Sequence, residues 1–336
     1  MQALADAIEG VHGLCELELS GNALESPRLL APLHGALPRC TQLTRLGLNS
    51  CSCMDALAEC PVAHLRHLRR LDLCRNACDT ATMRRVAALL GSMPCLQSLA
   101  LAACGLTSEH VTPLAADALA HAPYLTALTL ARNRSMLRET GALSLVRALG
   151  GLQRLQRLDL QHTGASGVCT ACLMDAVARL TDLRELYWAG AWIGSGRTLD
   201  ALLAGLAAMP RLEVLDLSES LLAPRSVASV AAALAGCGGL RALTLSENRI
   251  DADALAALLS TAGRCWPALR VLQLEVTYMG CVADVELPGF ERTGRSTLVA
   301  RAGGCAERGK DALVITLSAL AGFETAEQML RRRESA

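Results

Sequence analysis

The stretch Leu14-Cys-Glu-Leu17-Glu-Leu19-Ser-Gly-Asn22 decides the fold, because its pattern of leucines returns along most of the chain. The frame is Leu-x-x-Leu-x-Leu-x-x-Asn/Cys, and the chain holds ten copies of it. Their first leucines are Leu14, Leu43, Leu68, Leu96, Leu125, Leu155, Leu183, Leu212, Leu240 and Leu269. Successive first leucines are 25 to 30 residues apart. A motif that returns at such an interval predicts a solenoid, in which each copy is one unit stacked on the next.

The middle of each copy predicts a short β-strand. Leu71 and Leu73 alternate with Asp72, so both leucines point into the core while the aspartate points out. The ninth position of most copies holds a short polar residue, which can satisfy backbone groups of the turn that leaves the strand. Ala191 cannot do this, and it marks the seventh copy as irregular.

Amphipathic helices are predicted between the strands, because apolar residues recur there at helical spacing. One such segment runs from Met83 to Leu90. Four prolines stand two residues before the first leucine of the following copy, where they end the helix and favour an extended approach to the strand. They are Pro94, Pro123, Pro210 and Pro267.

This repeat pattern resembles the ribonuclease-inhibitor-like class of leucine-rich repeat proteins. The resemblance implies an α/β fold: a leucine-rich repeat solenoid (a horseshoe) with a parallel β-sheet on the concave face and α-helices on the convex face. We expect residues 1–277 to form ten repeats of about 28–29 residues in a single solenoid. Residues 278–336 are expected to form a divergent C-terminal insertion, a last strand at Asp311–Leu317 and a capping helix at Glu324–Arg333.

Composition and charge limit the classes of function. The 336 residues include 32 basic and 32 acidic side chains, and a formal net charge of zero argues against an electrostatic nucleic-acid binder. Hydrophobic residues make up 52% of the chain, which excludes disorder over most of its length. The uncharged stretch from Val86 to Ser108 is divided by Gly91 and Pro94, so it predicts a helix, a turn and a strand and no membrane span.

The location and the cysteines are interpreted together. The first twenty residues have no basic segment, and Asp6 and Glu9 interrupt their only apolar run, so we predict no secretory signal. We expect a cytoplasmic or otherwise intracellular protein, with a nuclear location left open. The fifteen cysteines are then expected to be reduced and to pack as small hydrophobes.

Two groups of cysteines have spacings that occur in metal or redox sites. Cys169 and Cys172 have the spacing of a dithiol. A second group could supply four zinc ligands and consists of Cys51, Cys53, Cys60, His64 and His67. We interpret both groups as structural and predict no metal site, although a redox or metal role stays open for each.

Catalytic constellations are missing from the sequence pattern. Gly289–Ser296 has the spacing of a phosphate-binding loop, but Arg295 stands where the lysine belongs, and we predict a flexible loop there. No Ser/His/Asp or Cys/His arrangement can be brought together from the sequence. We therefore predict that the chain is not an enzyme and takes no small-molecule cofactor.

The predicted binding surface is the concave face. Its candidate partner-binding residues stand at outward strand positions or just beyond the strands, and they are Asp72, Asp159, Glu185, Tyr187, Trp192, Asp216, Glu219, Glu247 and Glu275. The alternative interpretation is that these polar residues only solvate the open face of the sheet.

The seventh copy, Glu185-Leu-Tyr187-Trp188-Ala-Gly-Ala-Trp192, concentrates the aromatic residues. Trp188 takes a core leucine position and is expected to pack inside. Tyr187 should face outward, and Trp192 should lie in the loop at the rim. Tyrosine and tryptophan dominate interface hot spots. Alternatively, Trp192 fills space left by Ala191.

Three functions follow from the fold that the resemblance implies. The first is a non-catalytic scaffold that binds a protein partner of unknown identity on the concave face, with no nucleic-acid or membrane partner. The second is a GTPase-activating or GTPase-regulating protein resembling the Ran GTPase-activating proteins. It would use loop residues such as Arg75, Asn76, Arg132, Asn133 and Arg134. The third is a cysteine-rich, redox-sensitive inhibitor resembling ribonuclease inhibitors.

Overall fold

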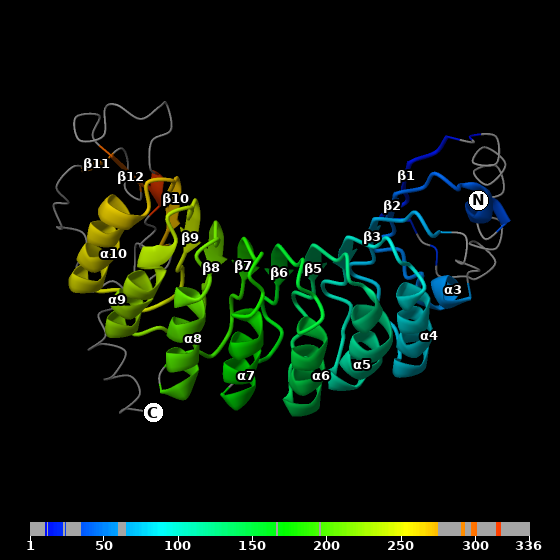
Figure 1. The fold of residues 1–336 in the computed structure, drawn as a ribbon, viewed down its shortest axis with the longest axis horizontal. Helices are drawn as coiled ribbons and strands as arrows, with labels where there is room; N and C mark the ends of the chain where they lie inside the picture. The colour runs from blue at the N-terminus through cyan, green and yellow to red at the C-terminus, as the bar shows by residue number, and fades with distance from the viewer. Residues whose placement is uncertain are drawn as a thin grey trace, which may run out of the picture.

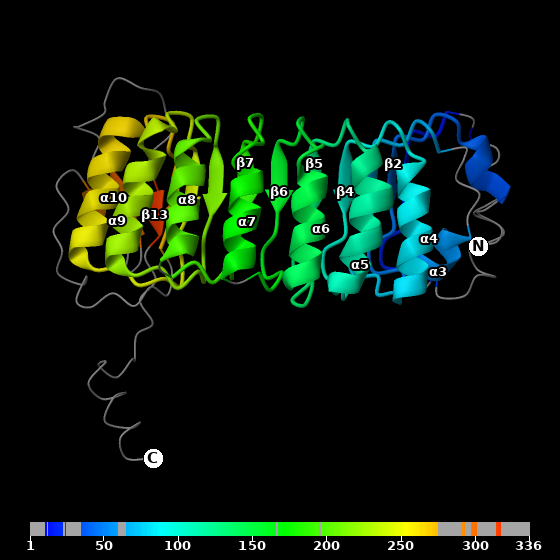
Figure 2. The ribbon, with the colours of Figure 1, turned by 60° about the horizontal axis from the view of Figure 1, so that its bottom comes forward.

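The chain is a leucine-rich repeat solenoid that curves so that strands line its concave face and helices its convex face (Figure 1). The structure is a computed structural model and describes residues 11, 13–22, 24, 35–59, 65–165, 167–194, 196–274, 290–292, 297–300 and 314–316. Its loops run along two edges, one where the strands begin and one where they end, and both edges are visible in Figure 2.

Ten short parallel strands coincide with the ten copies of the leucine frame. They are β1 (Glu16–Glu18), β2 (Arg45–Gly47), β3 (Arg70–Asp72), β4 (Ser98–Ala100), β5 (Ala127–Thr129), β6 (Arg157–Asp159), β7 (Glu185–Tyr187), β8 (Val214–Asp216), β9 (Ala242–Thr244) and β10 (Val271–Gln273). Each strand pairs with the next in the same register, so that Leu46 pairs with Leu71 and Leu71 with Leu99. The predicted fold class is confirmed.

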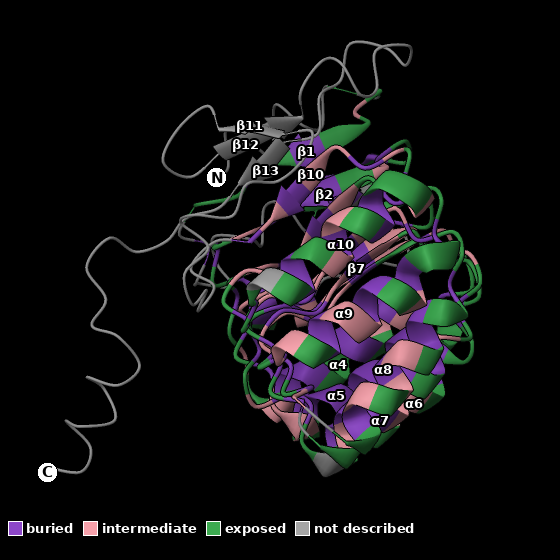
Figure 3. Cartoon of the chain, turned by 90° about the vertical axis from the view of Figure 1, so that its left-hand side faces the viewer, coloured by how far each residue is buried: buried purple, intermediate pink, exposed green. Residues whose placement is uncertain are grey.

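Helices cover the other side of the sheet. They are α3 (Met54–Ala58), α4 (Thr80–Gly91), α5 (Ser108–Pro113), α6 (Glu139–Leu149), α7 (Val168–Val177), α8 (Arg197–Ala207), α9 (Pro224–Ala233) and α10 (Ala252–Cys265). Short helical turns lie beside them at Leu37–Arg39, Leu114–Ala118, Leu119–His121 and Leu234–Gly236. Met83, Val86 and Leu90 of α4 are buried, and Figure 3 shows the helices buried on one side and exposed on the other. None of the described helices is long and apolar enough to cross a bilayer.

The core is a continuous layer of leucines between sheet and helices. The central leucine of each of the ten strands is buried, as are the leucines two positions later, such as Leu73 and Leu160. Fully burying one such side chain contributes about 1.5–3 kcal/mol relative to exposure. Every repeat supplies an equivalent pair of apolar side chains, with Trp188 in place of the second leucine in the seventh, so neighbouring repeats stabilise one another through one shared core.

A ladder of asparagine side chains ties the repeats together inside the turn that leaves the strand. Asn133 is 1% exposed; its Oδ1 accepts from the N–H groups of Cys104 and Leu106, both at 3.0 Å, and its Nδ2 donates to the carbonyls of Leu101 and Leu130. Equivalent bonds are made in the third repeat by Asn76 and in the ninth by Asn248. Each amide therefore joins its own repeat to the preceding one.

The residue before this ninth position adopts a left-handed backbone conformation in the first nine repeats, with φ from 51° to 76°. These residues are Gly21, Ser50, Arg75, Ala103, Arg132, His162, Gly190, Glu219 and Glu247. Most of them donate their N–H to a carbonyl of the next repeat, as Arg132 does to Gln161 at 2.7 Å. The turn is thus fixed by hydrogen bonding between repeats even where the residue is not glycine.

The C-terminal segment differs in part from its prediction. The predicted strand at Asp311–Leu317 is present as β13 (Val314–Thr316), parallel to β10. The segment expected to be an irregular insertion contains β11 (Phe290–Arg292) and β12 (Thr297–Ala300), which pair antiparallel. The predicted flexible loop is therefore wrong in part, because its residues Phe290–Arg292 form a strand. The predicted closing helix at Glu324–Arg333 lies outside the described residues.

Candidate functional site

The outward side chains of β6, β7 and β8 contact one another and form a joined polar surface. Arg157 of β6 donates from Nη1 to Glu185 of β7 at 2.8 Å, and its guanidinium lies 4.7 Å from the centre of the Tyr187 ring. The Tyr187 hydroxyl donates to the same Glu185 carboxylate at 3.1 Å. Since each of the three side chains contacts the other two, their positions are fixed in advance of any partner.

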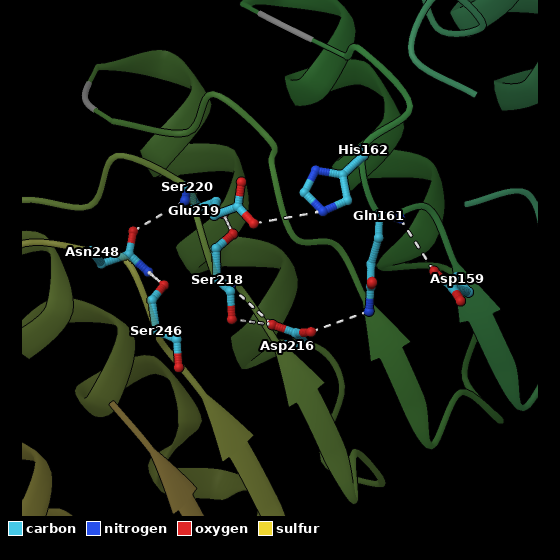
Figure 4. A network of polar contacts seen from close by, with 9 residues as sticks. All are labelled: Asp159, Gln161, His162, Asp216, Ser218, Glu219, Ser220, Ser246 and Asn248. Atoms are coloured by element: carbon cyan, nitrogen blue, oxygen red, sulfur yellow. Dashed lines mark hydrogen bonds and ion pairs between the residues drawn. The ribbon is translucent and has the colours of Figure 1, made fainter. Parts of the chain in front are cut away.

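Two aspartates flank Tyr187 in the ladder, Asp159 on β6 and Asp216 on β8. Gln161 reaches across β7 and donates from Nε2 to Asp216 at 3.1 Å, while its backbone N–H donates to Asp159 at 3.2 Å (Figure 4). The short side chain of Ala189, at the corresponding position of the seventh repeat, leaves this path open. Asp216 also accepts from the N–H of Ser218 at 2.9 Å and from its hydroxyl at 2.6 Å.

A second contact crosses the seventh repeat at the edge where the strands end. We call this edge, formed by the turns that follow each strand, the strand-exit edge. His162 and Glu219 both lie at the left-handed position of their turns, and His162 Nε2 is 3.7 Å from Glu219 Oε1 (Figure 4). Between them lies Gly190, where a Cβ would stand 2.5 Å from His162 Nδ1. The absence of a side chain at Gly190 is therefore what lets the histidine reach the glutamate.

Burial changes the acidity of two groups in this surface. It raises the pKa of Asp159, and the nearby Asp216 charge raises it further, although the N–H of Gln161 and the Arg157 cation act in the opposite direction. Burial also raises the pKa of the Tyr187 hydroxyl. Burial disfavours the ionised form of a carboxyl group, and a nearby cation stabilises that form. The surface therefore favours a positively charged group of a ligand.

The aromatic residues of the seventh repeat are divided between core and surface. Trp188 is 1% exposed, as expected for a core position. Trp192 is 67% exposed and Ala191 is 2% exposed, which contradicts the interpretation that Trp192 fills the space left by Ala191. Sequence reasoning missed Leu221, which is 61% exposed and occupies the same frame position one repeat later. A comparison of Trp192 with the tenth position of the next copy could have found it.

Trp192 and Leu221 are exposed apolar side chains in consecutive repeats, in the turns that follow β7 and β8. The loop that follows Trp192 is bonded to the eighth repeat, because the N–H groups of Ile193 and Gly194 lie 3.2 and 3.3 Å from the carbonyl oxygen of Ser220. A Cβ built on Gly194 would lie 4.0 Å from the Leu221 Cβ. Trp192 stands two residues after Gly190, and Leu221 stands two residues after Glu219, so both belong to the turns that the His162–Glu219 contact crosses.

The structure separates the other predicted partner-binding residues from this cluster. Asp72 lies on β3, three strands before β6, and its carboxylate accepts the N–H of Cys74 at 2.9 Å. Glu247 is exposed and lies next to Glu219 on the strand-exit edge, one repeat later. Glu275 lies outside the described residues.

The loop residues named for GTPase regulation fall into a buried group and an exposed group. Asn76 and Asn133 are 0% and 1% exposed and belong to the interior ladder, so the expectation that they contact a partner is wrong. The arginines at positions 75, 132 and 134 are exposed. Only these three remain available to a partner.

The cysteine groups show structural contacts. Cys51 is buried, and its Sγ donates to the Leu19 carbonyl at 3.1 Å, while burial raises the pKa of Cys53 to about 12. His67 is exposed, and Cys60 and His64 lie outside the described residues. Cys169 and Cys172 lie half-buried in α7. Within the described ranges, no group of three His, Cys, Asp or Glu residues is placed to hold a metal ion.

Comparison with known proteins gives one sequence relative and several solved structures of similar outline. No family model matches the chain. The chain is 29% identical over 255 residues to human "NACHT, LRR and PYD domains-containing protein 3", a match that covers 74% of this chain and 24% of that protein. The chain thus spans about a quarter of the length of this relative. The repeat frame and the ten parallel strands show a leucine-rich repeat solenoid, and the relative carries the same type of repeat in its name.

Three solved structures are similar in outline. The leucine-rich repeat-containing protein LegL7 from Legionella pneumophila is 17% identical with a TM-score of 0.49. The match covers 78% of this chain and 83% of the LegL7 chain. The TLR13–ssRNA13 complex is 19% identical with a TM-score of 0.45, at 81% and 37% coverage. An internalin from Listeria monocytogenes is 15% identical with a TM-score of 0.39, at 83% and 84% coverage.

Proposed function

We propose that the chain is a non-catalytic scaffold that binds a protein partner on the β6–β8 part of its concave face and on the adjoining strand-exit edge. One observation carries the proposal: the exposed side chains of Trp192 and Leu221 lie beside a polar surface that is already bridged across three strands. Large apolar side chains at the centre of a patch with a polar rim are typical of protein interfaces.

Fixed side chains favour tight binding. Arg157, Glu185 and Tyr187 restrain one another, and Gln161 is held by Asp216. A partner therefore loses little side-chain entropy of the scaffold when it binds. Because burial raises the pKa of Asp159, a partner that presents a basic side chain there gains from neutralising that charge.

The test is partner capture by the intact protein and by a Tyr187→Ala/Trp192→Ala variant. The matched control is Tyr124→Ala/Leu143→Ala, which removes two side chains that are 48% and 52% exposed elsewhere on the surface. We expect the first variant alone to lose a partner, with unchanged thermal melting of both. Identical capture by all three proteins would contradict the proposal.

The second candidate function, regulation of a GTPase, is favoured by the exposed arginines at positions 75, 132 and 134 on the strand-exit edge. Arginine stabilises the charge that develops on a transferring phosphoryl group. Under this candidate, a captured GTPase would hydrolyse GTP faster with the intact protein, and Arg132→Ala would remove the acceleration. No acceleration of a captured GTPase would rule it out.

A further inference from the structure

The edge at which β6 to β10 begin is lined by arginines. We define this strand-entry edge as residues 150–156, 178–184, 208–213, 237–241 and 266–270, which connect each helix to the next strand. Its basic residues are Arg154, Arg179, Arg184, Arg211, Arg241 and Arg270, and its acidic residues are Asp182 and Glu213. Six cations against two anions give this edge a charge of +4 in a chain whose formal net charge is zero.

Backbone hydrogen bonds place these residues next to one another. The N–H of Glu213 donates to the carbonyl of Arg184 at 2.7 Å, that of Arg241 to Glu213 at 2.6 Å, and that of Arg270 to Arg241 at 2.8 Å. Neighbouring strands lie about 4.8 Å apart, so the five repeats from β6 to β10 present a row of roughly 19 Å. An extended peptide of about six residues spans that length.

Ion pairs within the edge leave the arginines on the outside. Glu213 is shared by Arg184 at 2.5 Å and Arg241 at 3.4 Å; its side chain is 21% exposed, while those of the two arginines are 50% and 67% exposed. Arg211 pairs with Asp182 at 2.6 Å and is 62% exposed. Glu213 is thus largely covered, and the Arg211 side chain is more exposed than that of Asp182, at 62% against 42%.

The preference of helix C-termini for cations does not explain the row of arginines. Cations are stabilised at the C-terminus of a helix, but the effect falls off within its last turn. Arg184, Arg241 and Arg270 directly precede strands and lie beyond those turns. The opposite edge is described for β6 to β9, at residues 160–165, 167, 188–194, 196, 217–223 and 245–251, and has one arginine against Glu219, Glu247 and Asp251. The two edges therefore carry charges of opposite sign.

We propose that the strand-entry edge is a second docking surface, distinct from the concave face, which binds an acidic polypeptide segment. The planar guanidinium group matches a carboxylate with two parallel hydrogen bonds. Asp182 and Glu213 interrupt the row, which disfavours the uninterrupted negative charge of a nucleic-acid backbone. A polypeptide can instead place its acidic side chains opposite the arginines alone.

The experiment measures binding of a labelled peptide of twelve glutamates to the full chain by fluorescence anisotropy. The test variant is Arg184→Gln/Arg211→Gln/Arg241→Gln. The matched control, Arg75→Gln/Arg132→Gln/Arg134→Gln, removes three charges from the strand-exit edge. We expect the test variant to bind about tenfold more weakly, because each exposed ion pair contributes about a factor of two, and the control to change less than about twofold.

Three outcomes would overturn the proposal: no binding of the glutamate peptide by the intact protein, equal weakening in both variants, or tighter binding of a twelve-nucleotide uridine RNA than of the peptide. If the triple variant does not fold, Arg154→Gln/Arg179→Gln removes two cations of the same edge that form no ion pair within the described ranges. This double variant should weaken binding about fourfold. Tyr187→Ala/Trp192→Ala should leave peptide binding unchanged, which separates this proposal from the concave-face function.

Discussion

The stretch from β3 to β5 and the stretch from β6 to β8 share one backbone, but their repeats are connected by different groups. In the first, Asn76 and Asn133 join the repeats from the interior. The outward positions between them carry small residues, among them Ala100, Ala127 and Ala131. In the second stretch the interior positions hold Thr163, Ala191 and Ser220, and the connections lie on the concave face and its rim.

The odd-numbered repeats make this difference clear. The first, third, fifth and ninth carry asparagine at the ninth position, and the seventh carries alanine. Where the asparagine is missing, Arg157, Gln161 and His162 reach the seventh or eighth repeat from outside. A polar group inside the turn serves only the fold, whereas a polar group on the concave face can also meet a partner. The shift from interior to surface therefore puts the proposed binding site at a repeat that has no buried asparagine amide in its turn.

The largest effect that would sharpen this comparison is expected for Asn133→Ala. Alanine leaves two buried N–H groups and two buried carbonyls without their partner, which should lower the free energy of unfolding by about 3–4 kcal/mol. Thr163→Ala is the matched control, because Thr163 makes a single bond to the Leu160 carbonyl and should cost about 1 kcal/mol. Urea unfolding of both variants measures the difference, and equal losses would refute the interior role of the ladder.

The next effect concerns the bridge over the seventh repeat. Gly190→Ala should cost about 2 kcal/mol, because alanine is strained at a φ of 72° and its Cβ displaces His162 from Glu219. Gly21→Ala has the same backbone strain at a φ of 76°, but nothing lies within 4 Å of its Cβ, so about 1 kcal/mol is expected. Thermal melting compares the two, and an equal cost would mean that the bridge is unimportant.

A smaller and opposite effect is expected when the interior ladder is completed. Ala191→Asn would offer the N–H groups of Thr163 and Ala165 the amide oxygen that Asn133 offers Cys104 and Leu106. We expect a gain of about 1 kcal/mol in the free energy of unfolding. Chemical denaturation tests this, and a loss of stability would show that the interior has closed around Ala191.

The smallest effect is expected for Asp159→Asn. This substitution tests how much the partly buried charge of Asp159 lowers the free energy of unfolding. Burial raises the pKa of Asp159 in the folded state, so its ionised form destabilises the fold above that pKa. At pH 7 the variant should be more stable by less than about 1 kcal/mol, since its Oδ1 still accepts the Gln161 N–H. The gain should vanish as the pH falls through the raised pKa towards the ordinary value. Denaturation at pH 7 and pH 4 measures it, and a less stable variant at pH 7 would contradict the charge assignment.

The repeat frame was sufficient to predict the strands and the buried helix faces, because both follow from apolar spacing alone. Two kinds of feature were beyond it. The Asn133 amide bonds two repeats at once, and this depends on how closely consecutive turns stack. The contact between Gln161 and Asp216 joins residues 55 positions apart and depends on the reach of one side chain past Ala189. Sequence could rank the outward carboxylates as candidates, but it could not tell that Asp159 and Asp216 share a network while Asp72 stands apart.

The gap in the asparagine ladder has a mechanical consequence. A solenoid deforms elastically, and its stiffness at each point depends on the hydrogen bonds and contacts that resist separation of adjacent repeats. At Ala191 one set of interior bonds is absent, so stretching or twisting of the two ends should concentrate its deformation between β6 and β8. The repeat that breaks the odd-numbered asparagine series then lies directly beneath the proposed partner site. A ligand that spans these three strands would act as a clamp and stiffen the whole arc.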